Sequence, residues 1–214
     1  MRYGLVVFDF DGTLVDTSEP ILLSINAALG SAGLPPRPRE DVLPLVGLGL
    51  RRVLPRLARA PCHVAALPEA SRAHVDTVVA GRTRPFDGVV DALDRIAGRG
   101  ARLAIATSRS KASLEAILDA HGLKGRFALL VTAHCVPQTT PEPDMIHKSA
   151  ADLRADPRRA GMGGDTTYDL AMGRAAGTAT CGVTWGSHDA TALRPLADHL
   201  AERAADLPAL LGYR

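Results

Sequence analysis

Lysine is scarce in this chain of 214 residues, and positive charge is nowhere concentrated. Lys111, Lys124 and Lys148 are its lysines, the other basic residues are arginines, and the formal net charge is only +2. The basic residues are dispersed, with no polybasic run. Binding to nucleic acid or to a membrane surface therefore has no support, because both depend on clustered positive charge.

Cysteine and long apolar runs are also lacking. Cys62, Cys135 and Cys181 are widely spaced and form no CxxC pair, which indicates reduced thiols rather than a disulfide framework or a zinc site. No apolar stretch approaches the length of a membrane span, and the apolar run before Asp9 is too short for a signal peptide. We therefore expect a cytoplasmic protein.

What the sequence does contain is a regular alternation of short apolar runs and helical patterns. Strands are expected at Tyr3–Phe8, Leu103–Ala106, Phe127–Val131 and Thr180–Trp185, and helices at Phe86–Ala97, Ser113–His121, Pro143–Leu153 and Asp169–Ala176. A further strand is expected at Ala160–Gly164 despite its glycines, because the alternation requires a strand between two helices. The pattern predicts an α/β fold with a Rossmann-like parallel sheet and right-handed crossovers.

Residues 17–83 interrupt this alternation. They contain helical candidates and no convincing strand, at Glu19–Leu29, Arg39–Leu45, Leu50–Ala58 and Pro68–Val79. We interpret residues 17–83 as an inserted α-helical cap domain over the carboxyl edge of the sheet, and residues 1–16 and 84–214 as the catalytic core. The alternative is that these helices simply pack on the core.

Two carboxylates follow the first apolar run, Asp9 and Asp11 in the stretch DFDGTLVD. Side chains at i and i+2 of a strand point the same way, so both can converge on one small volume. Such a pair suits a divalent cation, or a nucleophile beside an acid/base. The alternative is a solvated turn, since Asp and Gly are common turn residues.

Polar residues also follow other expected strands. Thr107, Ser108 and Arg109 come after one, and Asp165 and Asp169 lie four apart at another strand-to-helix turn. Individually, Asp165 suits a turn and Asp169 a helix cap. Because ligand-binding groups gather beyond the carboxyl ends of parallel strands, the combination indicates a site there.

This arrangement resembles the haloacid dehalogenase superfamily of phosphotransferases, in its phosphoglycolate phosphatase-like branch with a small helical cap. The first motif, DxDGTLxD, is matched by residues 9–16, and the fourth motif, GDxxxD, by residues 164–169. Thr107 matches the second motif, a Thr or Ser that ends a strand. The resemblance covers essentially the whole chain.

The resemblance implies a Mg²⁺-dependent phosphatase acting on a small phosphorylated metabolite. Asp9 would be the nucleophile that forms an aspartyl-phosphate, and Asp11 would protonate the leaving oxygen and then activate water. Asp9, the backbone carbonyl of Asp11 and Asp165 would hold the metal, with Asp169 assisting through water. The acid at Asp11 argues against a dehalogenase, because a halide leaves without a proton.

The phosphoryl group has its own expected contacts. The resemblance gives Thr107 a hydrogen bond to a phosphoryl oxygen, together with backbone N–H groups near Phe10, Asp11 and Ser108.

The third motif departs from the family pattern, because Thr140 stands where a lysine is expected before Pro-x-Pro. Arg109 or Lys148 can supply the missing cation, although Lys148 can equally pair with Asp144 four residues earlier on a helix surface. Alternatively, the enzyme is weak, or the protein is a catalytically impaired phosphate-ligand binding or regulatory protein. A sugar-phosphate mutase of the same fold is a further alternative.

In the expected cap, Arg51 and Arg52 follow a glycine-rich turn. They can contact the distal end of the substrate, where arginine suits a carboxylate or a second phosphate. The alternative is a solvated helix face. We expect a monomer or a homodimer.

Overall fold

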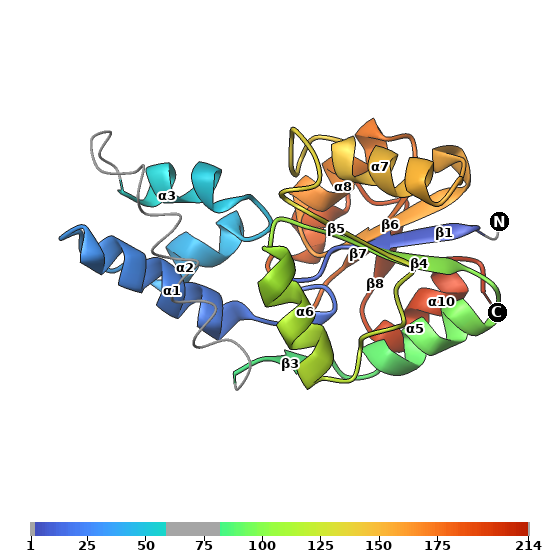
Figure 1. Ribbon diagram of the computed structural model, residues 1–214, viewed down its shortest axis with the longest axis horizontal. Coiled ribbons are helices and arrows are strands. Elements are labelled where there is room, and N and C mark those ends of the chain that lie inside the picture. Colours follow the sequence, from blue (N-terminus) through green and yellow to red (C-terminus); the bar gives the residue numbers. More distant parts are fainter. Residues whose placement is uncertain (1–2, 59–81, 214) are drawn as a thin grey trace.

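A six-stranded parallel sheet forms the centre of the computed structural model, which describes residues 3–58 and 82–213. The strand order is β5-β4-β1-β6-β7-β8 (Figure 1). The strands are β1 (Leu5–Phe8), β4 (Arg102–Thr107), β5 (Leu129–Thr132), β6 (Ala160–Gly164), β7 (Ala179–Val183) and β8 (His199–Ala201). The sequence leaves β1 for β4 on one side and returns to β6 on the other, so β1 lies at the switch point where open α/β sheets bind ligands.

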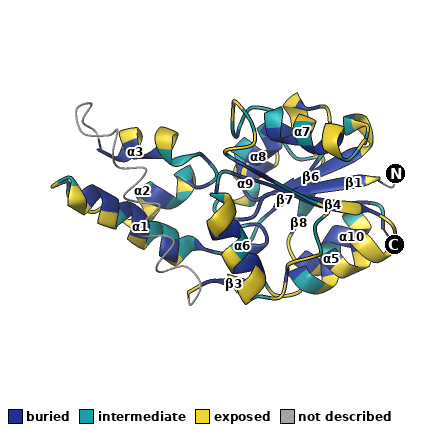
Figure 2. Ribbon diagram, in the orientation of Figure 1, coloured by how far each residue is buried: buried dark blue, intermediate teal, exposed yellow. Residues whose placement is uncertain are grey.

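Helices cover both faces of this sheet. They are α5 (Val89–Gly98), α6 (Lys111–Ala120), α7 (Asp144–Asp152), α8 (Thr167–Ala175), α9 (Ala190–Leu193) and α10 (Leu207–Leu210), with 3₁₀ turns at Pro157–Arg159 and Ala204–Asp206. Val6 and Phe8 pack with α5, α6 and the segment around α10, whereas Leu5 and Val7 pack with α7 and α8. Alternate residues of β1 thus serve two apolar layers, as a strand buried on both faces requires. Figure 2 shows the strands buried and the helices exposed along their outer sides.

A helical insertion follows β1 and lies beyond the carboxyl end of the strands (Figure 1). It consists of α1 (Ser18–Ser31), α2 (Arg39–Val42), a 3₁₀ turn at Leu43–Leu45 and α3 (Leu50–Ala58). The insertion has an apolar core of its own, built around Ile25, Leu29 and Leu54. A two-stranded antiparallel ribbon, β2 (Val15–Asp16) and β3 (Arg84–Pro85), joins the segments that enter and leave it.

The predicted fold class is confirmed, including the glycine-containing strand at Ala160–Gly164, which is fully buried as β6. The expected helix at Pro68–Val79 lies outside the described residues. The sequence reading missed β8 and the β2–β3 ribbon. β8 is a three-residue edge strand, and each strand of the ribbon has two residues, so neither carries a periodic pattern.

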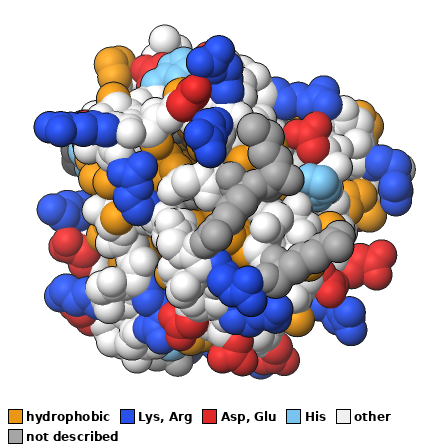
Figure 3. Space-filling model, turned by 90° about the vertical axis from the view of Figure 1, so that its right-hand side faces the viewer, with side chains coloured by type: hydrophobic (Ala, Val, Ile, Leu, Met, Phe, Trp, Pro, Cys, Tyr) orange, Lys and Arg blue, Asp and Glu red, His pale blue; other side chains and the backbone are white. Residues whose placement is uncertain are grey.

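The sequence predicted no concentrated positive charge, no disulfide and no membrane-spanning helix. On the face seen in Figure 3, basic and acidic side chains are interspersed. Cys135 and Cys181, the cysteines within the described residues, are free thiols, and Cys62 lies outside these residues. No helix within residues 3–58 and 82–213 combines the length and the apolar character needed to cross a membrane.

Candidate active site

Three buried carboxylates meet where β1 and β6 end. Asp9 follows β1, Asp165 follows β6, and Asp169 lies in the first turn of α8. One carboxylate oxygen from each lies within 4.8 Å of the other two. β1 and β6 are hydrogen-bonded neighbours with Phe8 opposite Gly163, so the sheet register itself places Asp9 beside Asp165.

Asp9 has an unsatisfied oxygen in this cluster. The residue is only 4% exposed, and its Oδ2 has no hydrogen-bond partner. Burial raises the pKa of Asp9 well above its usual range, and the carboxylates of Asp169, Asp165 and Asp11 raise it further, against a smaller lowering by the Phe10 N–H. A carboxylate in this position is poorly stabilised unless a cation or a proton joins it.

Asp165 is held by hydrogen bonds from two distant segments. The hydroxyl of Thr13 donates to Oδ1 at 2.9 Å, and the backbone N–H of Ser187 donates to Oδ2 at 2.7 Å. Gly12 and Gly186 pass so close that a Cβ on either would lie 2.3 Å from Oδ2. Burial raises the pKa of Asp165, and these hydrogen bonds oppose the rise.

Asp169 caps α8 and still keeps one oxygen free for a ligand. Its Oδ2 accepts the N–H of Thr166 at 3.0 Å and the Thr166 hydroxyl at 2.7 Å, which completes a capping box. Its Oδ1 is buried without a partner. Burial first, and the nearby charge of Asp165 second, raise the pKa of Asp169 to about 7.

The cluster fits a divalent metal ion. The unpartnered oxygens of Asp9 and Asp169 belong to the same group as Asp165, and all the ligand atoms are carboxylate oxygens. Hard cations such as Mg²⁺ prefer oxygen ligands. A bound cation would satisfy the two orphaned atoms and offset the repulsion that raises these pKa values.

Asp11 points away from this cluster and pairs with Arg109. Nε of Arg109 lies 3.2 Å from Oδ1 and 3.1 Å from Oδ2, and Nη2 also donates to Oδ1. Nη1 donates to the Ser113 hydroxyl at 2.7 Å, and Thr17 donates to Asp11 Oδ1 at 2.7 Å. Arg109 is therefore the cation of this site in the described part of the chain, and its contacts hold Asp11 rather than Asp9.

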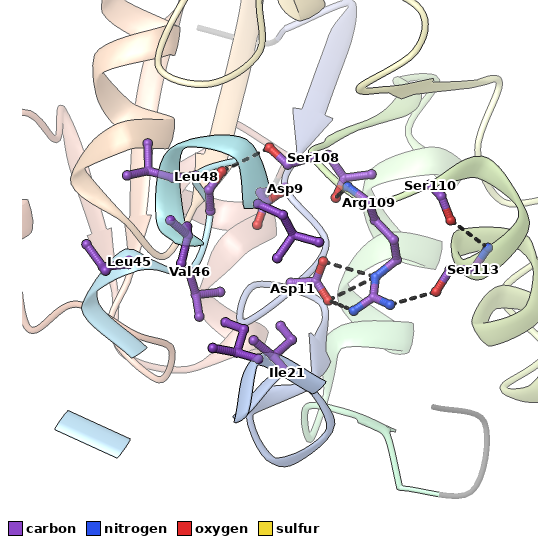
Figure 4. Close-up of a pocket in the computed structure, with 15 residues that line it drawn as sticks. Asp9, Asp11, Ile21, Leu45, Val46, Leu48, Ser108, Arg109, Ser110 and Ser113 are labelled. Atoms are coloured by element: carbon purple, nitrogen blue, oxygen red, sulfur yellow. Dashed lines mark hydrogen bonds and ion pairs between the residues drawn. The ribbon is translucent and has the colours of Figure 1, made fainter. Parts of the chain in front are cut away.

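A cavity of about 100 Å³ separates the sheet edge from the helical insertion (Figure 4). Asp9, Asp11, Thr107 and Arg109 line it from the core. The described residues of the insertion contribute apolar side chains only, together with the backbone of Gly47: Ile21, Ile25, Leu45, Val46, Leu48, Leu50 and Val53. The insertion thus covers the reactive side chains with an apolar surface.

Hydrogen bonds join the insertion to the core around this cavity. The Ser108 hydroxyl donates to the carbonyl of Gly47 at 3.0 Å. The carbonyl of Pro44 lies 3.2 Å from the Tyr168 hydroxyl, which donates to it, and 3.0 Å from Nε2 of His188. The Ser108 hydroxyl is therefore bonded to the insertion. The Thr107 hydroxyl accepts the backbone N–H of Arg109 at 3.2 Å, and its own proton remains available to donate.

The other candidate cations lie elsewhere. Lys148 is on an exposed helix surface and pairs at 2.9 Å with Asp152, not with Asp144 as the spacing allowed. Arg51 and Arg52 are exposed and do not line the cavity; Arg52 lies 3.8 Å from Glu142. At the lysine position of the third motif, Thr140 is buried, and its hydroxyl contacts the Met172 sulfur at 3.8 Å.

Several site residues were not singled out from the sequence. Thr13 and Thr166 lie inside the two matched motifs, so their position next to the carboxylates was the available signal. Ser187 follows β7 and acts through its backbone N–H. A backbone donor does not depend on the side chain, so the residue type gives no signal for it. Ser113 serves the site only because α6 brings it to Arg109.

Comparisons with known proteins agree with this geometry. Residues 6–183 match the family model of the haloacid dehalogenase-like hydrolases. The chain is 36% identical over 196 residues to the probable phosphatase IndB of Dickeya dadantii, covering 89% of this chain and 85% of that protein. It is 33% identical over 187 residues to a phosphoglycolate phosphatase of Caulobacter vibrioides, covering 85% and 79%. It is 29% identical over 218 residues to the pyrophosphatase PpaX of Bacillus velezensis, covering 100% and 98%.

Solved structures share the same fold. A predicted phosphoglycolate phosphatase of Haemophilus somnus superposes with a TM-score of 0.87 at 22% identity, covering 98% of each chain. A hydrolase of Pseudomonas syringae superposes with a TM-score of 0.86, also at 22% identity, covering 96% of each chain.

Proposed function

Because this chain belongs to the haloacid dehalogenase-like hydrolases and is a phosphatase of that family, we propose that it hydrolyses a small phosphorylated metabolite through an aspartyl-phosphate on Asp9, with Mg²⁺ as cofactor. The observation that carries the proposal is the buried cluster of Asp9, Asp165 and Asp169 beside a covered cavity. Because relatives are named phosphoglycolate phosphatase and pyrophosphatase, phosphoglycolate and pyrophosphate are the first substrates to examine.

Asp9 and Asp11 divide the chemistry between them. A carboxylate oxygen of Asp9 attacks phosphorus, a bond from that oxygen to phosphorus forms, and the bond to the alcohol oxygen breaks. Asp11 gives the departing oxygen its proton. Water then attacks the phosphoryl group and loses a proton to Asp11, which releases inorganic phosphate and restores Asp9.

The remaining residues stabilise charge. Asp9, the backbone carbonyl of Asp11, Asp165 and Asp169 would hold Mg²⁺, which when bound supplies the positive charge that offsets carboxylates and phosphoryl oxygens. The Thr107 hydroxyl and backbone N–H groups near Phe10, Asp11 and Ser108 donate to the phosphoryl oxygens. Arg109 keeps Asp11 oriented toward the cavity through the pairing described above.

The helical insertion acts as a cap in this proposal. We assign it residues 17–83, with residues 1–16 and 84–214 as the core. Its apolar side chains exclude bulk water from the phosphoryl group during transfer, and its opening admits substrate.

Trapping the intermediate tests the proposal directly. Purified protein with Mg²⁺ is mixed with phosphomonoesters including phosphoglycolate, and phosphate release is measured. Borohydride then reduces any acyl phosphate, and mass spectrometry identifies homoserine at position 9. We expect phosphate release and homoserine in the wild type and neither in Asp9→Asn. Asp119→Asn is the control and should behave like the wild type, because the Asp119 carboxylate pairs with Lys124 on the surface. Equal phosphate release by Asp9→Asn would overturn the proposal.

Catalytically impaired phosphate binding is the second candidate. The observation in its favour is that no lysine or arginine side chain within the described residues hydrogen-bonds to Asp9, and that Thr140 occupies the lysine position. That candidate predicts Mg²⁺-dependent phosphate binding by calorimetry without turnover of any ester. The mutase alternative has no specific observation in its favour. The cytoplasmic location and the monomeric or homodimeric state stay predictions.

A further inference from the structure

The cavity between cap and core is chemically divided. Its core side carries the carboxylates, hydroxyls and guanidinium of the proposed reaction, and every side chain that the described part of the cap contributes is aliphatic. Ile21, Leu45, Val46 and Leu48, labelled in Figure 4, are among the cap residues that line this cavity with Asp9 and Asp11. In a phosphatase whose nucleophile is Asp9, the group attached to the phosphate extends toward this aliphatic wall.

Apart from Asp9 and Thr107, which serve the proposed reaction, the polar side chains on the core side hydrogen-bond to other protein groups. All three guanidinium nitrogens of Arg109 donate to Asp11 or Ser113. The Ser108 hydroxyl donates to the Gly47 carbonyl, and the Ser110 hydroxyl accepts the Ser113 N–H at the start of α6. Among the cavity-lining residues that the structure describes, Arg109 is the one cation, and its charge is already paired with Asp11.

Arg51 and Arg52, the two cap arginines expected to contact substrate, face away from the cavity. Leu50 and Val53 of α3 line it, whereas Arg51 and Arg52, between them in sequence, are exposed. A helix turns by about 100° per residue, so the two pairs lie on different faces of α3. The orientation of α3 thus presents leucine and valine to the substrate and directs the positive charge to solvent.

We propose that the substrate is a phosphomonoester whose leaving alcohol is small, uncharged and aliphatic, rather than one that carries a carboxylate or a second phosphate. This inference rests on the proposed phosphatase function and narrows it. Burying an unpaired carboxylate against aliphatic side chains carries a large desolvation penalty, whereas a branched alkyl group gains free energy there. The cavity volume of about 100 Å³ limits the group to a few carbon atoms.

An isosteric pair of substrates tests this selectivity. Isobutyl phosphate and phosphoglycolate have the same skeleton, with two methyl groups in place of the two carboxylate oxygens. We expect kcat/KM to be at least tenfold higher for isobutyl phosphate, although the glycolate alkoxide is the better leaving group. Equal or higher kcat/KM for phosphoglycolate would overturn the inference and leave the proposed function intact. No turnover of either ester above Asp9→Asn would contradict the proposed function, and the inference would fall with it.

A charge placed in the cap wall provides a second test, with a matched control elsewhere on the cap. Leu50 lines the cavity and is partly exposed, and Leu23 is 37% exposed on α1 and does not line it. We expect Leu50→Arg to lower the preference for isobutyl phosphate at least tenfold and Leu23→Arg to leave it unchanged. A preference that is the same in Leu50→Arg and the wild type would overturn the assignment of this wall to the leaving group.

Discussion

Arg109 and Asp11 form a closely coupled ion pair at the edge of the proposed active site. Their side chains are 6% and 13% exposed, and two guanidinium nitrogens contact the carboxylate. Two residues that are 98 positions apart in the chain are thereby fixed to each other, because β1 and β4 are neighbouring parallel strands. The pair leaves the carboxylates of Asp9, Asp165 and Asp169 without a cationic partner among the described residues, which a metal ion would supply.

Removing the arginine should therefore disturb both stability and catalysis. We expect Arg109→Gln to lower the free energy of unfolding by about 2–4 kcal/mol, because it leaves a partly buried carboxylate unpaired. We expect kcat to fall by roughly 10–100-fold as Asp11 loses its orientation. Lys148→Gln, which breaks an exposed pair, should change stability by less than about 0.5 kcal/mol. Chemical denaturation of Arg109→Gln, Asp11→Asn and the variant with both substitutions measures the coupling energy between Arg109 and Asp11. A coupling energy near zero would contradict the pairing.

Thr13 should control the affinity for Mg²⁺ through Asp165. Its hydroxyl orients Oδ1 of Asp165, and groups that orient metal ligands typically contribute about 10–100-fold in affinity. We expect Thr13→Val to weaken Mg²⁺ binding by that factor in calorimetric titration. Thr178→Val is the matched control, because its hydroxyl donates to the Gly173 carbonyl instead. Equal Mg²⁺ affinity in Thr13→Val and wild type would show that the Thr13 hydroxyl does not control metal binding through Asp165.

Asp169 should make the metal-free protein less stable as pH rises. Its pKa is raised from 3.8 to about 7, so the folded state holds a proton that the unfolded chain has already lost between these values. The resulting penalty is absent below pH 3.8, grows between the two values and is complete above about 7. Over this range we expect the wild type to lose roughly 1–4 kcal/mol of unfolding free energy relative to Asp169→Asn.

Saturating Mg²⁺ should cancel this pH dependence, since a cation stabilises the ionised carboxylate. Denaturation at several pH values, with Mg²⁺ and with EDTA, measures the effect. Parallel stability profiles for wild type and Asp169→Asn in EDTA would refute the prediction.

Thr140→Lys should improve catalysis if the cluster lacks a cation. We expect kcat to rise by about 10²–10³-fold, since one fixed donor contributes on that scale to transition-state stabilisation. Thr139→Lys, at the half-buried neighbouring position, should have no such effect. The measurement is kcat in saturating Mg²⁺, and an unchanged kcat in Thr140→Lys would indicate that the site already has sufficient positive charge.

Sequence alone predicted the elements whose patterns are local. The apolar runs of β1 and β4 and the helical period of α3 appear in a few adjacent residues, so strands and helices were found to within a few positions. The strand β6 was inferred from the alternation, although its glycines argued against it. The edge strand β8 was not predicted, because its three residues carry no periodic pattern and its pairing with β7 is made by backbone groups.

The carboxylates of the site were determined by the sequence as well. Asp9, Asp11, Asp165 and Asp169 belong to contiguous motifs at strand ends, and a parallel sheet brings such ends together whatever the details of packing. Their partners were decided by the tertiary structure. Only folding shows that Arg109 faces Asp11, that α3 turns its arginines outward, and that an aliphatic wall covers the nucleophile, because side-chain direction and the approach of cap to core depend on contacts between residues distant in the chain.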